Sequence, residues 1–207
     1  MGSDDNLKGS SARLWKLIEE RMVVGAKVEE IDQRIWDLFG EEWAVVFTDL
    51  AGFSRQVAKF GIIHFLQIIR EQQRLLLPVV EAHDGILIKI EADSFLILFK
   101  KPLQALRCAI AMQHKCQQVN ARRAAEEQVI LCCGVGFGRI LKIGDEDVFG
   151  HEVNLASKLG EDTAKGNEIL VTPAVRQAIG DTPIATWEEM QVEFAGEHVC
   201  WRAVYSR

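Results

Sequence analysis

The chain has 207 residues, of which 48% are hydrophobic and 26% charged, and its formal net charge is −6. This length and hydrophobic content support one folded domain with an appendage and exclude global disorder. The acidic balance argues against nucleic acid as a partner, because phosphates require a basic surface. No apolar run reaches the roughly 18 residues that span a bilayer, and the polar N-terminus lacks a signal-peptide core. We therefore expect a cytoplasmic protein without membrane insertion.

Residues 1–42 predict a tail and a helical segment. Residues 1–10 are expected to be a disordered tail or a remnant of expression. A helix should run from a cap at Ser10 or Ser11 to about Met22, with a break at Gly25. A two-heptad apolar stripe follows, made of Val24, Val28, Ile31, Ile35 and Leu38. Two interpretations of 11–42 stand: a helical segment packed on its own domain, or a short parallel dimer stalk.

Residues 43–207 predict one domain that begins with a fully apolar strand, WAVVF, at 43–47. A long helix follows, and then two apolar strands joined by the short polar turn EAD as a hairpin. The later strand at 129–138 should turn at its glycines into a second arm, RILKIG. The predicted elements in chain order are strand 43–47, helix 55–83, strands 86–90 and 94–99, helix 102–119, a charged connection at 121–127, strand 129–138, helix 151–164, strand 168–172, a short helix ending at Gly180, and two C-terminal strands.

The order of these elements defines the fold class. The first six form a β-α-β-β-α-β series, which is the ferredoxin-like arrangement of an antiparallel sheet covered by helices on one face. Additional α and β elements follow at the C-terminus. We therefore predict an α+β domain.

The five cysteines have no paired spacing and predict buried, reduced thiols rather than a zinc site; they are Cys108, Cys116, Cys132, Cys133 and Cys200.

Two aspartates stand at the ends of predicted buried strands. Asp49 follows WAVVFT, and Asp93 lies in the turn of the hairpin. Each alone is most simply a turn or cap residue. In the ferredoxin-like order, however, the first strand and this turn can be neighbours, and two adjacent carboxylates repel unless a cation lies between them. Mg²⁺ uses one or two carboxylates together with substrate phosphates. Gly52, just after Asp49, lets the backbone approach a phosphate closely at the start of a helix.

A second polar pair lies in EVNLASKLGED at 152–162. Asn154 and Lys158 are four residues apart and therefore share one face of the predicted helix. They are either a solvated pair or a donor and a cation directed together at a phosphate.

Three segments then stand in a fixed order: FTDLAGFS (47–54), KIEADSFLILF (89–99) and EDVFGHEVNLASKL (146–159). Together they resemble the catalytic domain of class III nucleotide cyclases, over roughly 43–205. Members of that family show an FTDIxGFT-like element, a KxxGD-like hairpin and a DxWGxxVNxASR-like helix entry. The resemblance implies the class III cyclase fold and a catalytic domain at 43–207.

The resemblance assigns the metal and phosphate contacts. Asp49 and Asp93 would hold two Mg²⁺ or Mn²⁺ ions per site, with the backbone carbonyl of Leu50 as a further ligand. The β- and γ-phosphates would be bound by the backbone around Ala51, Gly52 and Phe53, with Ser54.

The resemblance also assigns the contacts to the nucleoside. Lys89 would meet the purine ring and Asp147 its exocyclic amine, Asn154 would orient the ribose, and Lys158 stands where the family usually has an arginine that stabilises the transition state. An ammonium donating to N1 and a carboxylate accepting from the amino group suit adenine, whereas guanine reverses both polarities. Guanylyl members generally carry Glu and a Cys-like residue at these two positions. Lys89 and Asp147 thus predict ATP.

The family geometry further implies a homodimer with active sites at its interface. The metal aspartates of one protomer would face the purine, ribose and phosphate residues of the other.

Three departures from the family pattern stand out: Ala92 replaces the usual glycine, Lys158 replaces arginine, and AGEHVCWR (195–202) offers no triphosphate lysine after a short connection at 133–150. Ala92 is tolerable if the turn needs no positive φ. These departures leave a weakly active or inactive nucleotide-binding regulatory dimer module, or a guanylyl cyclase, as alternatives to an adenylyl cyclase.

Overall fold

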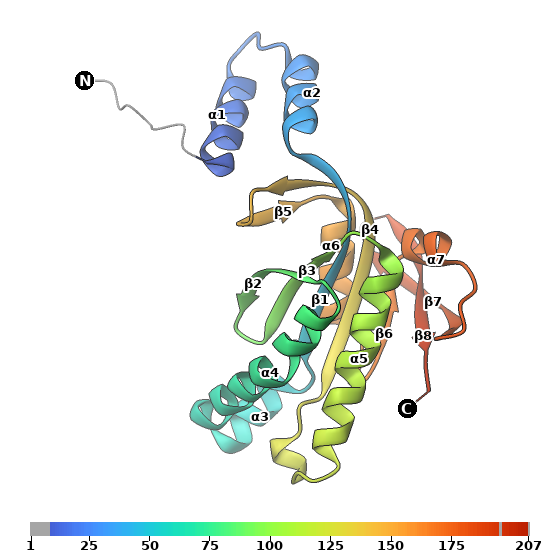
Figure 1. The fold of residues 1–207 in the computed structure, drawn as a ribbon. Helices are drawn as coiled ribbons and strands as arrows, with labels where there is room; N and C mark the ends of the chain where they lie inside the picture. The colour runs from blue at the N-terminus through green and yellow to red at the C-terminus, as the bar shows by residue number, and fades with distance from the viewer. Residues whose placement is uncertain (1–8, 195, 207) are drawn as a thin grey trace.

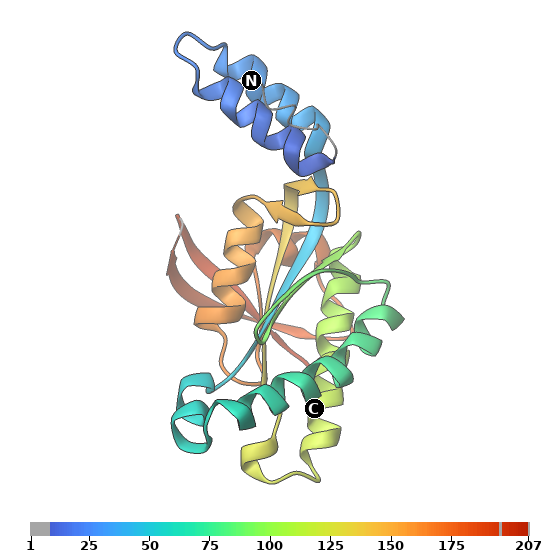
Figure 2. The same cartoon turned by 90° about the vertical axis from the view of Figure 1, so that its left-hand side faces the viewer.

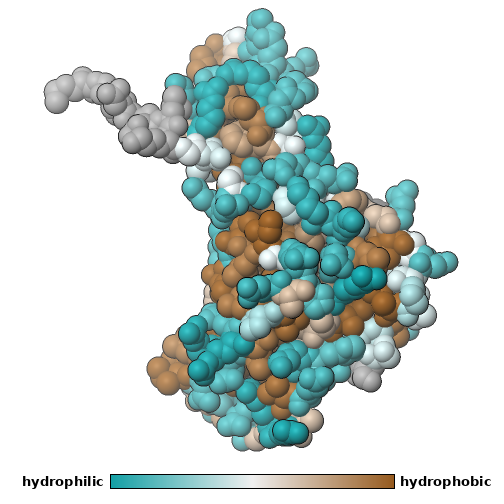
Figure 3. Space-filling view, in the orientation of Figure 1, coloured by the Kyte–Doolittle hydropathy of each residue, from teal (hydrophilic) through white to brown (hydrophobic). Residues whose placement is uncertain are grey.

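The computed structural model describes the backbone at residues 9–194 and 196–206, with side chains except at 53–56, 194, 197 and 198. The predicted disorder of the tail therefore lies mostly outside the described residues. Within these ranges no helix is both long and apolar enough to cross a membrane. The face drawn in Figure 3 mixes hydrophilic and hydrophobic patches.

The chain begins with a helical hairpin that stands at one end of the sheet domain (Figures 1 and 2). Helix α1 (Ser10–Met22) and helix α2 (Val28–Phe39) bury apolar side chains between them and against Ile143. Val24 lies in the connecting turn and is fully exposed, so the predicted stripe is not one continuous helix. The break at Gly25 is confirmed. The predicted serine cap is wrong, because Ser10 already begins the first helical turn and the N-cap is Gly9.

Four antiparallel strands form the centre of the sheet. They are β1 (Gly40–Leu50), β2 (Ile86–Glu91), β3 (Ser94–Phe99) and β4 (Leu131–Ile143). Their order, β2-β3-β1-β4, is the predicted ferredoxin-like arrangement. Strand β1 lies between β3 and β4, with Thr48 opposite Phe95 and Asp49 opposite Cys132. The hydrophobic pattern therefore predicted both the elements and their pairing, and the α+β class is confirmed.

The C-terminal strands extend this sheet and change its character. Strand β6 (Ile169–Val171) pairs with β4 in parallel, and β8 (Glu197–Val204) and β7 (Thr186–Phe194) follow as an antiparallel pair. The short strand β5 (Asp147–Phe149) folds back on the end of β4. The sheet of the described chain is therefore mixed, and the expectation of a purely antiparallel sheet holds only for its first four strands.

Helices cover both faces of the sheet, which corrects the expectation of one covered face (Figure 2). Helices α4 (Ile62–Ala82) and α5 (Pro102–Asn120) enclose the larger core, which also contains α7 (Pro173–Ile179). Helix α6 (His151–Ser157) packs on the opposite face against β1 and β4 and continues as the π-helical turn η2 (Lys158–Thr163). A 3₁₀ turn, η1 (Ala125–Glu127), lies in the predicted charged connection. All five cysteines are buried and unpaired, as expected.

Glycines explain the two remaining differences from the predicted elements. The helix expected over 55–83 is divided into α3 (Phe53–Phe60) and α4, because Gly61 has a φ of 86°. The turn expected within 134–138 is absent from the described chain, and β4 runs straight through it. A Cβ on Gly134 would lie 2.1 Å from the carbonyl oxygen of Ala156. These glycines therefore let α6 approach the sheet rather than turn the chain.

Candidate active site

The fold brings the two predicted metal aspartates together. Asp49 is half-buried near the end of β1, and Asp93, 8% exposed, lies in the β2–β3 turn beside it. Burial, followed by the charge and hydrogen bond of Asp93, raises the pKa of Asp49 from 3.8 to about 7. A hydrogen bond from the Leu50 backbone opposes this shift, and the charge of Glu161 adds to it. Two carboxylates thus share one place, and among the described residues no positive charge contributes to the shift.

This pair fits a divalent cation. The Oδ2 atom of Asp93 is buried and has no hydrogen-bond partner among the described residues, and a metal ligated there would satisfy it while cancelling the repulsion from Asp49. The described residues contain no group of three or more His, Cys, Asp or Glu side chains that could hold a metal. The aspartates would therefore supply only part of a coordination shell, which suits Mg²⁺ or Mn²⁺ completed by substrate oxygens.

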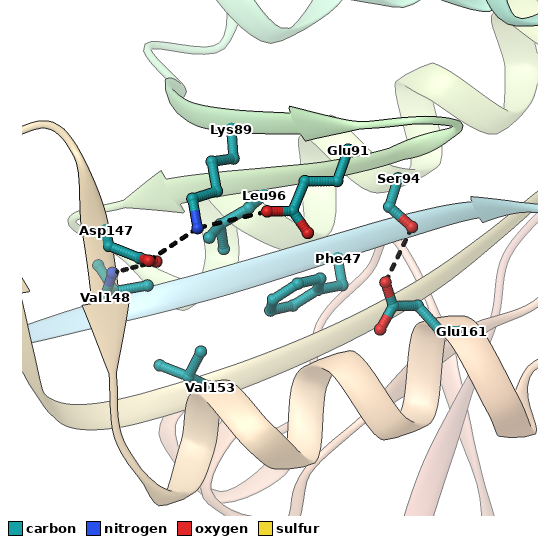
Figure 4. A pocket seen from close by; sticks show the side chains of 9 residues that line it. All are labelled: Phe47, Lys89, Glu91, Ser94, Leu96, Asp147, Val148, Val153 and Glu161. Atoms are coloured by element: carbon teal, nitrogen blue, oxygen red, sulfur yellow. Dashed lines mark hydrogen bonds and ion pairs between the residues drawn. The ribbon is translucent and has the colours of Figure 1, made fainter.

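A cavity of about 110 Å³ lies between the β2–β3 hairpin, β5 and α6 (Figure 4). Lys89 and Asp147 meet in it, with 2.7 Å between Nζ and Oδ2, and Glu91 is a second partner of Lys89 at 3.3 Å. The hydrogen bond with Asp147 is the main cause that raises the pKa of Lys89. The other side chains that line the cavity are Phe47, Ser94, Leu96, Val148, Val153 and Glu161.

The cavity ends near the two aspartates at a contact that the sequence did not reveal. Ser94 donates to Glu161 over 2.8 Å, and Glu161 also accepts a hydrogen bond from Ser157. Ser94 and Glu161 are 67 residues apart, and neither stands in a motif that would have linked them. Figure 4 shows Glu161 reaching from the helix toward the hairpin.

Asn154 and Lys158 occupy a different surface. Both are exposed on α6 and the start of η2, and neither lines the cavity around Lys89. Lys158 Nζ lies 2.5 Å from Asp162 Oδ2 in an exposed ion pair. Six of the predicted site residues thus fall into three places: the aspartate pair, the Lys89–Asp147 pair and this helical face.

The predicted phosphate loop begins α3. Gly52 is the N-cap of that helix with a φ of 88°, a conformation that favours glycine. The amide of Ala51 donates to the carbonyl of Ile130 over 2.9 Å, so this N–H is already satisfied. The side chains of Phe53 and Ser54 lie outside the described residues, and their predicted roles stay predictions.

Ala92 does not meet the condition under which its replacement of glycine was tolerable. Its φ is 51°, in the left-handed region. An alanine there is strained by about 1–2 kcal/mol relative to the right-handed region. The turn that carries Asp93 therefore has a positive φ, the conformation that favours glycine.

Comparison with known proteins shows the family of the chain. Residues 40–202 match the family model described as the adenylate and guanylate cyclase catalytic domain. A Rhizobium meliloti (strain 1021) protein named "Putative adenylate cyclase 3" is 28% identical over 116 residues, which are 56% of this chain and 20% of that protein. The chain therefore spans about a fifth of the length of this relative.

Solved structures share the fold. An adenylate/guanylate cyclase/hydrolase from Silicibacter pomeroyi superposes with a TM-score of 0.71 at 24% identity, covering 81% of this chain and 98% of that one. The adenylyl cyclase CyaB from P. aeruginosa gives a TM-score of 0.68 at 21% identity, covering 81% and 96%. Because the family model matches most of this chain, the chain belongs to the adenylate and guanylate cyclase catalytic domain family.

Proposed function

We propose that the chain is an adenylyl cyclase, which converts ATP to 3′,5′-cyclic AMP and pyrophosphate. The observation that carries this choice is the Lys89–Asp147 pair in the cavity, 2.7 Å apart. It places a donor and an acceptor side by side where a purine edge would lie. Adenine presents the complementary order, with N1 as acceptor and the C6 amino group as donor. Guanine presents a donor and an acceptor at the same two atoms and would meet like against like.

The reaction is an in-line displacement within one substrate. The ribose 3′-oxygen attacks the α-phosphorus, the bond to the pyrophosphate oxygen breaks, and the 3′-hydroxyl proton is released to solvent. Asn154 orients the ribose, Lys158 neutralises charge on the reacting phosphoryl group, and the Gly52 turn receives the outer phosphates. Mg²⁺ or Mn²⁺ bound by Asp49 and Asp93 would lower the pKa of the 3′-hydroxyl and neutralise the triphosphate.

A homodimer with two shared sites accounts for the separation of these residues. In one chain, Asn154 and Lys158 are exposed and do not line the cavity. A twofold axis would set this helical face of one protomer against the Asp49–Asp93 pair of its partner, and the reverse. Each protomer would then contribute to both sites, and a monomer would hold only half of each.

The choice of substrate is tested with purified protein and Mn²⁺, offering ATP or GTP and measuring both cyclic nucleotides. We expect cyclic AMP from ATP and little product from GTP. Cyclic GMP formed from GTP in excess of cyclic AMP formed from ATP would overturn the adenylyl assignment. Binding of ATP with no product from either nucleotide would instead favour an inactive regulatory module.

That second candidate rests on a specific contact. Lys158 is paired with Asp162 rather than free, and a lysine lacks the planar fork with which arginine holds two phosphate oxygens. A chain with these features fits a weakly active nucleotide-binding dimer. Retention of both metal aspartates favours the enzyme, because a module that only dimerises gains nothing from two repelling carboxylates.

Complementation tests the shared site. Asp49→Ala and Asn154→Ala protomers should each be inactive alone, and their mixture should recover activity because one site in each heterodimer is intact. The matched control mixes Asp49→Ala with Asp93→Ala, where both lesions fall on the same half of the site and no intact site forms. Equal activity in the two mixtures, with heterodimers confirmed, would exclude shared sites.

A further inference from the structure

The turn that carries Asp93 is held at three successive residues by three different elements. The side-chain amide of Gln72, on α4, donates to the backbone carbonyl of Asp93 over 2.8 Å. The hydroxyl of Ser94 donates to Glu161 over 2.8 Å, and the amide of Phe95 donates to the hydroxyl of Thr48 over 3.2 Å. The turn is thus fixed from the helical layer behind the sheet, from the opposite face, and from β1.

Left to itself, this turn would not stay in its observed conformation. Ala92 holds a positive φ of 51°, which an alanine adopts only under constraint. The adjacent Asp93 carboxylate is buried beside Asp49, and its Oδ2 atom has no hydrogen-bond partner in the described chain. Strain and repulsion both favour moving Asp93 away, so the surrounding bonds must oppose that movement.

Gln72 supplies a buried restraint from α4, as Thr48 does from β1. The Gln72 side chain is fully buried, so water cannot replace its bond to Asp93. Glu161 is exposed, so water competes for its bond with Ser94. The Oε1 atom of Gln72 is buried without a hydrogen-bond partner among the described residues. A buried glutamine that leaves half its amide unsatisfied is unfavourable for stability by itself. Its donor bond to the Asp93 carbonyl is the contact that explains its presence.

We propose that Gln72 is a positioning residue for the metal site: it fixes the Asp93 turn so that the carboxylate is already placed for a divalent cation. The proposal rests on the assignment of Asp93 as a metal ligand within the proposed function. It adds a residue of α4 that touches neither metal nor nucleotide. Because Gln72 acts on the backbone of Asp93, its loss should weaken metal binding before any nucleotide is present.

Gln113 provides a matched control. It is equally buried, and its Oε1 atom is likewise without a hydrogen-bond partner in the described residues. Its amide donates to the backbone carbonyls of Leu131 over 3.0 Å and Glu168 over 3.4 Å, and to Cys133 Sγ over 3.8 Å. It lies on α5 and makes no bond to either aspartate. Gln72→Met and Gln113→Met therefore both remove a buried amide donor to backbone and preserve side-chain length, with more bonds lost at Gln113.

The test measures Mn²⁺ affinity by titration calorimetry without nucleotide, alongside urea unfolding of each variant. We expect Gln72→Met to raise the Mn²⁺ Kd about fivefold or more, the factor expected for one lost hydrogen bond. Gln113→Met should leave the Kd within about twofold while losing at least as much stability as Gln72→Met. Adding Ala92→Gly to Gln72→Met should recover part of the affinity, since glycine removes the strain that the metal must otherwise overcome.

Equal Kd values in the two methionine variants, or no recovery with Ala92→Gly, would overturn the proposal. No Mn²⁺ binding by the unaltered protein would overturn it as well. If Gln72→Met does not fold, Gln72→Leu and the double variant test the same bond. A weakened Mn²⁺ affinity in a protein that makes no cyclic nucleotide would support the positioning role and reject the cyclase. Cyclic AMP formation with a Mn²⁺ affinity that Gln72→Met leaves unaffected would support the cyclase and reject the positioning role.

Discussion

Replacing Asp49 with asparagine should stabilise the metal-free protein, and more at high pH than at low pH. The folded protein raises the pKa of Asp49 from 3.8 to about 7, first through burial and then through Asp93. The unfolded chain therefore loses this proton near pH 4 while the folded one keeps it to about pH 7. Stability associated with Asp49 is present below pH 4 and declines as the pH rises to 7.

The magnitude follows from the size of the shift. About three pKa units at 1.36 kcal/mol each correspond to about 4 kcal/mol. Asp49 is only half-buried, so screening by water reduces this to about 2 kcal/mol. Asp49→Asn removes the penalty. The variant should exceed the unaltered protein in free energy of unfolding by about 2 kcal/mol at pH 8 and by about 1 kcal/mol at pH 5.

Urea unfolding in the presence of a chelator measures both values. Asp37→Asn is the control, because Asp37 is an exposed carboxylate on α2 that accepts a hydrogen bond from Gln33 far from the site. When Mn²⁺ replaces the chelator, it should stabilise the unaltered protein by about 2.7 kcal/mol at a hundredfold excess over Kd. It should stabilise Asp49→Asn much less. A difference between Asp49→Asn and the unaltered protein that stays constant from pH 5 to pH 8 would refute the reasoning.

Three further predictions concern the remaining parts of the fold and site. Lys158→Arg should raise kcat about fivefold through one additional charge-assisted hydrogen bond; an unchanged rate would mean that residue 158 does not face the phosphoryl group. Lys89→Glu with Asp147→Cys should shift the ATP-to-GTP ratio of kcat/KM toward GTP by about a hundredfold, because two hydrogen bonds change polarity; competition kinetics measure it. Gly134→Ala should lower the free energy of unfolding by about 3 kcal/mol, since its Cβ would clash with backbone, whereas Gly138→Ala, which meets only the flexible Glu152 side chain, should be milder.

The sequence predicted that the two aspartates are neighbours because strand order brings their two segments together. Once β1 and the β2–β3 hairpin are recognised from their apolar runs, the ferredoxin-like order makes β3 the neighbour of β1. Asp49 and the turn at Asp93 must then lie at the same end of the neighbouring strands β1 and β3. Their shared environment follows from the register Thr48 to Phe95, which the sequence left open within a residue or two.

Contacts between distant segments could not be predicted in the same way. Gly134 stands in an apolar strand, where a glycine equally indicates a turn, a bulge or a close approach. Only the position of α6 on that face shows which one applies. Gln72 lies in the middle of a long helix, and nothing in its spacing indicates that it reaches the Asp93 carbonyl. Such residues act through tertiary packing, which local periodicity does not encode.

The Lys158–Asp162 ion pair constrains the side chain of Lys158 only weakly. Both side chains are about half-exposed, at 49% and 56%, and an exposed pair of this kind contributes about 0–1 kcal/mol. A phosphate brought near Lys158 by a partner protomer would offer more than one negative charge in a drier site, so exchange of Asp162 for phosphate is favourable. Asp162→Asn should therefore leave stability within about 0.5 kcal/mol. Its effect on kcat should be small as well, and a large loss would show that Asp162 orients Lys158 during the reaction.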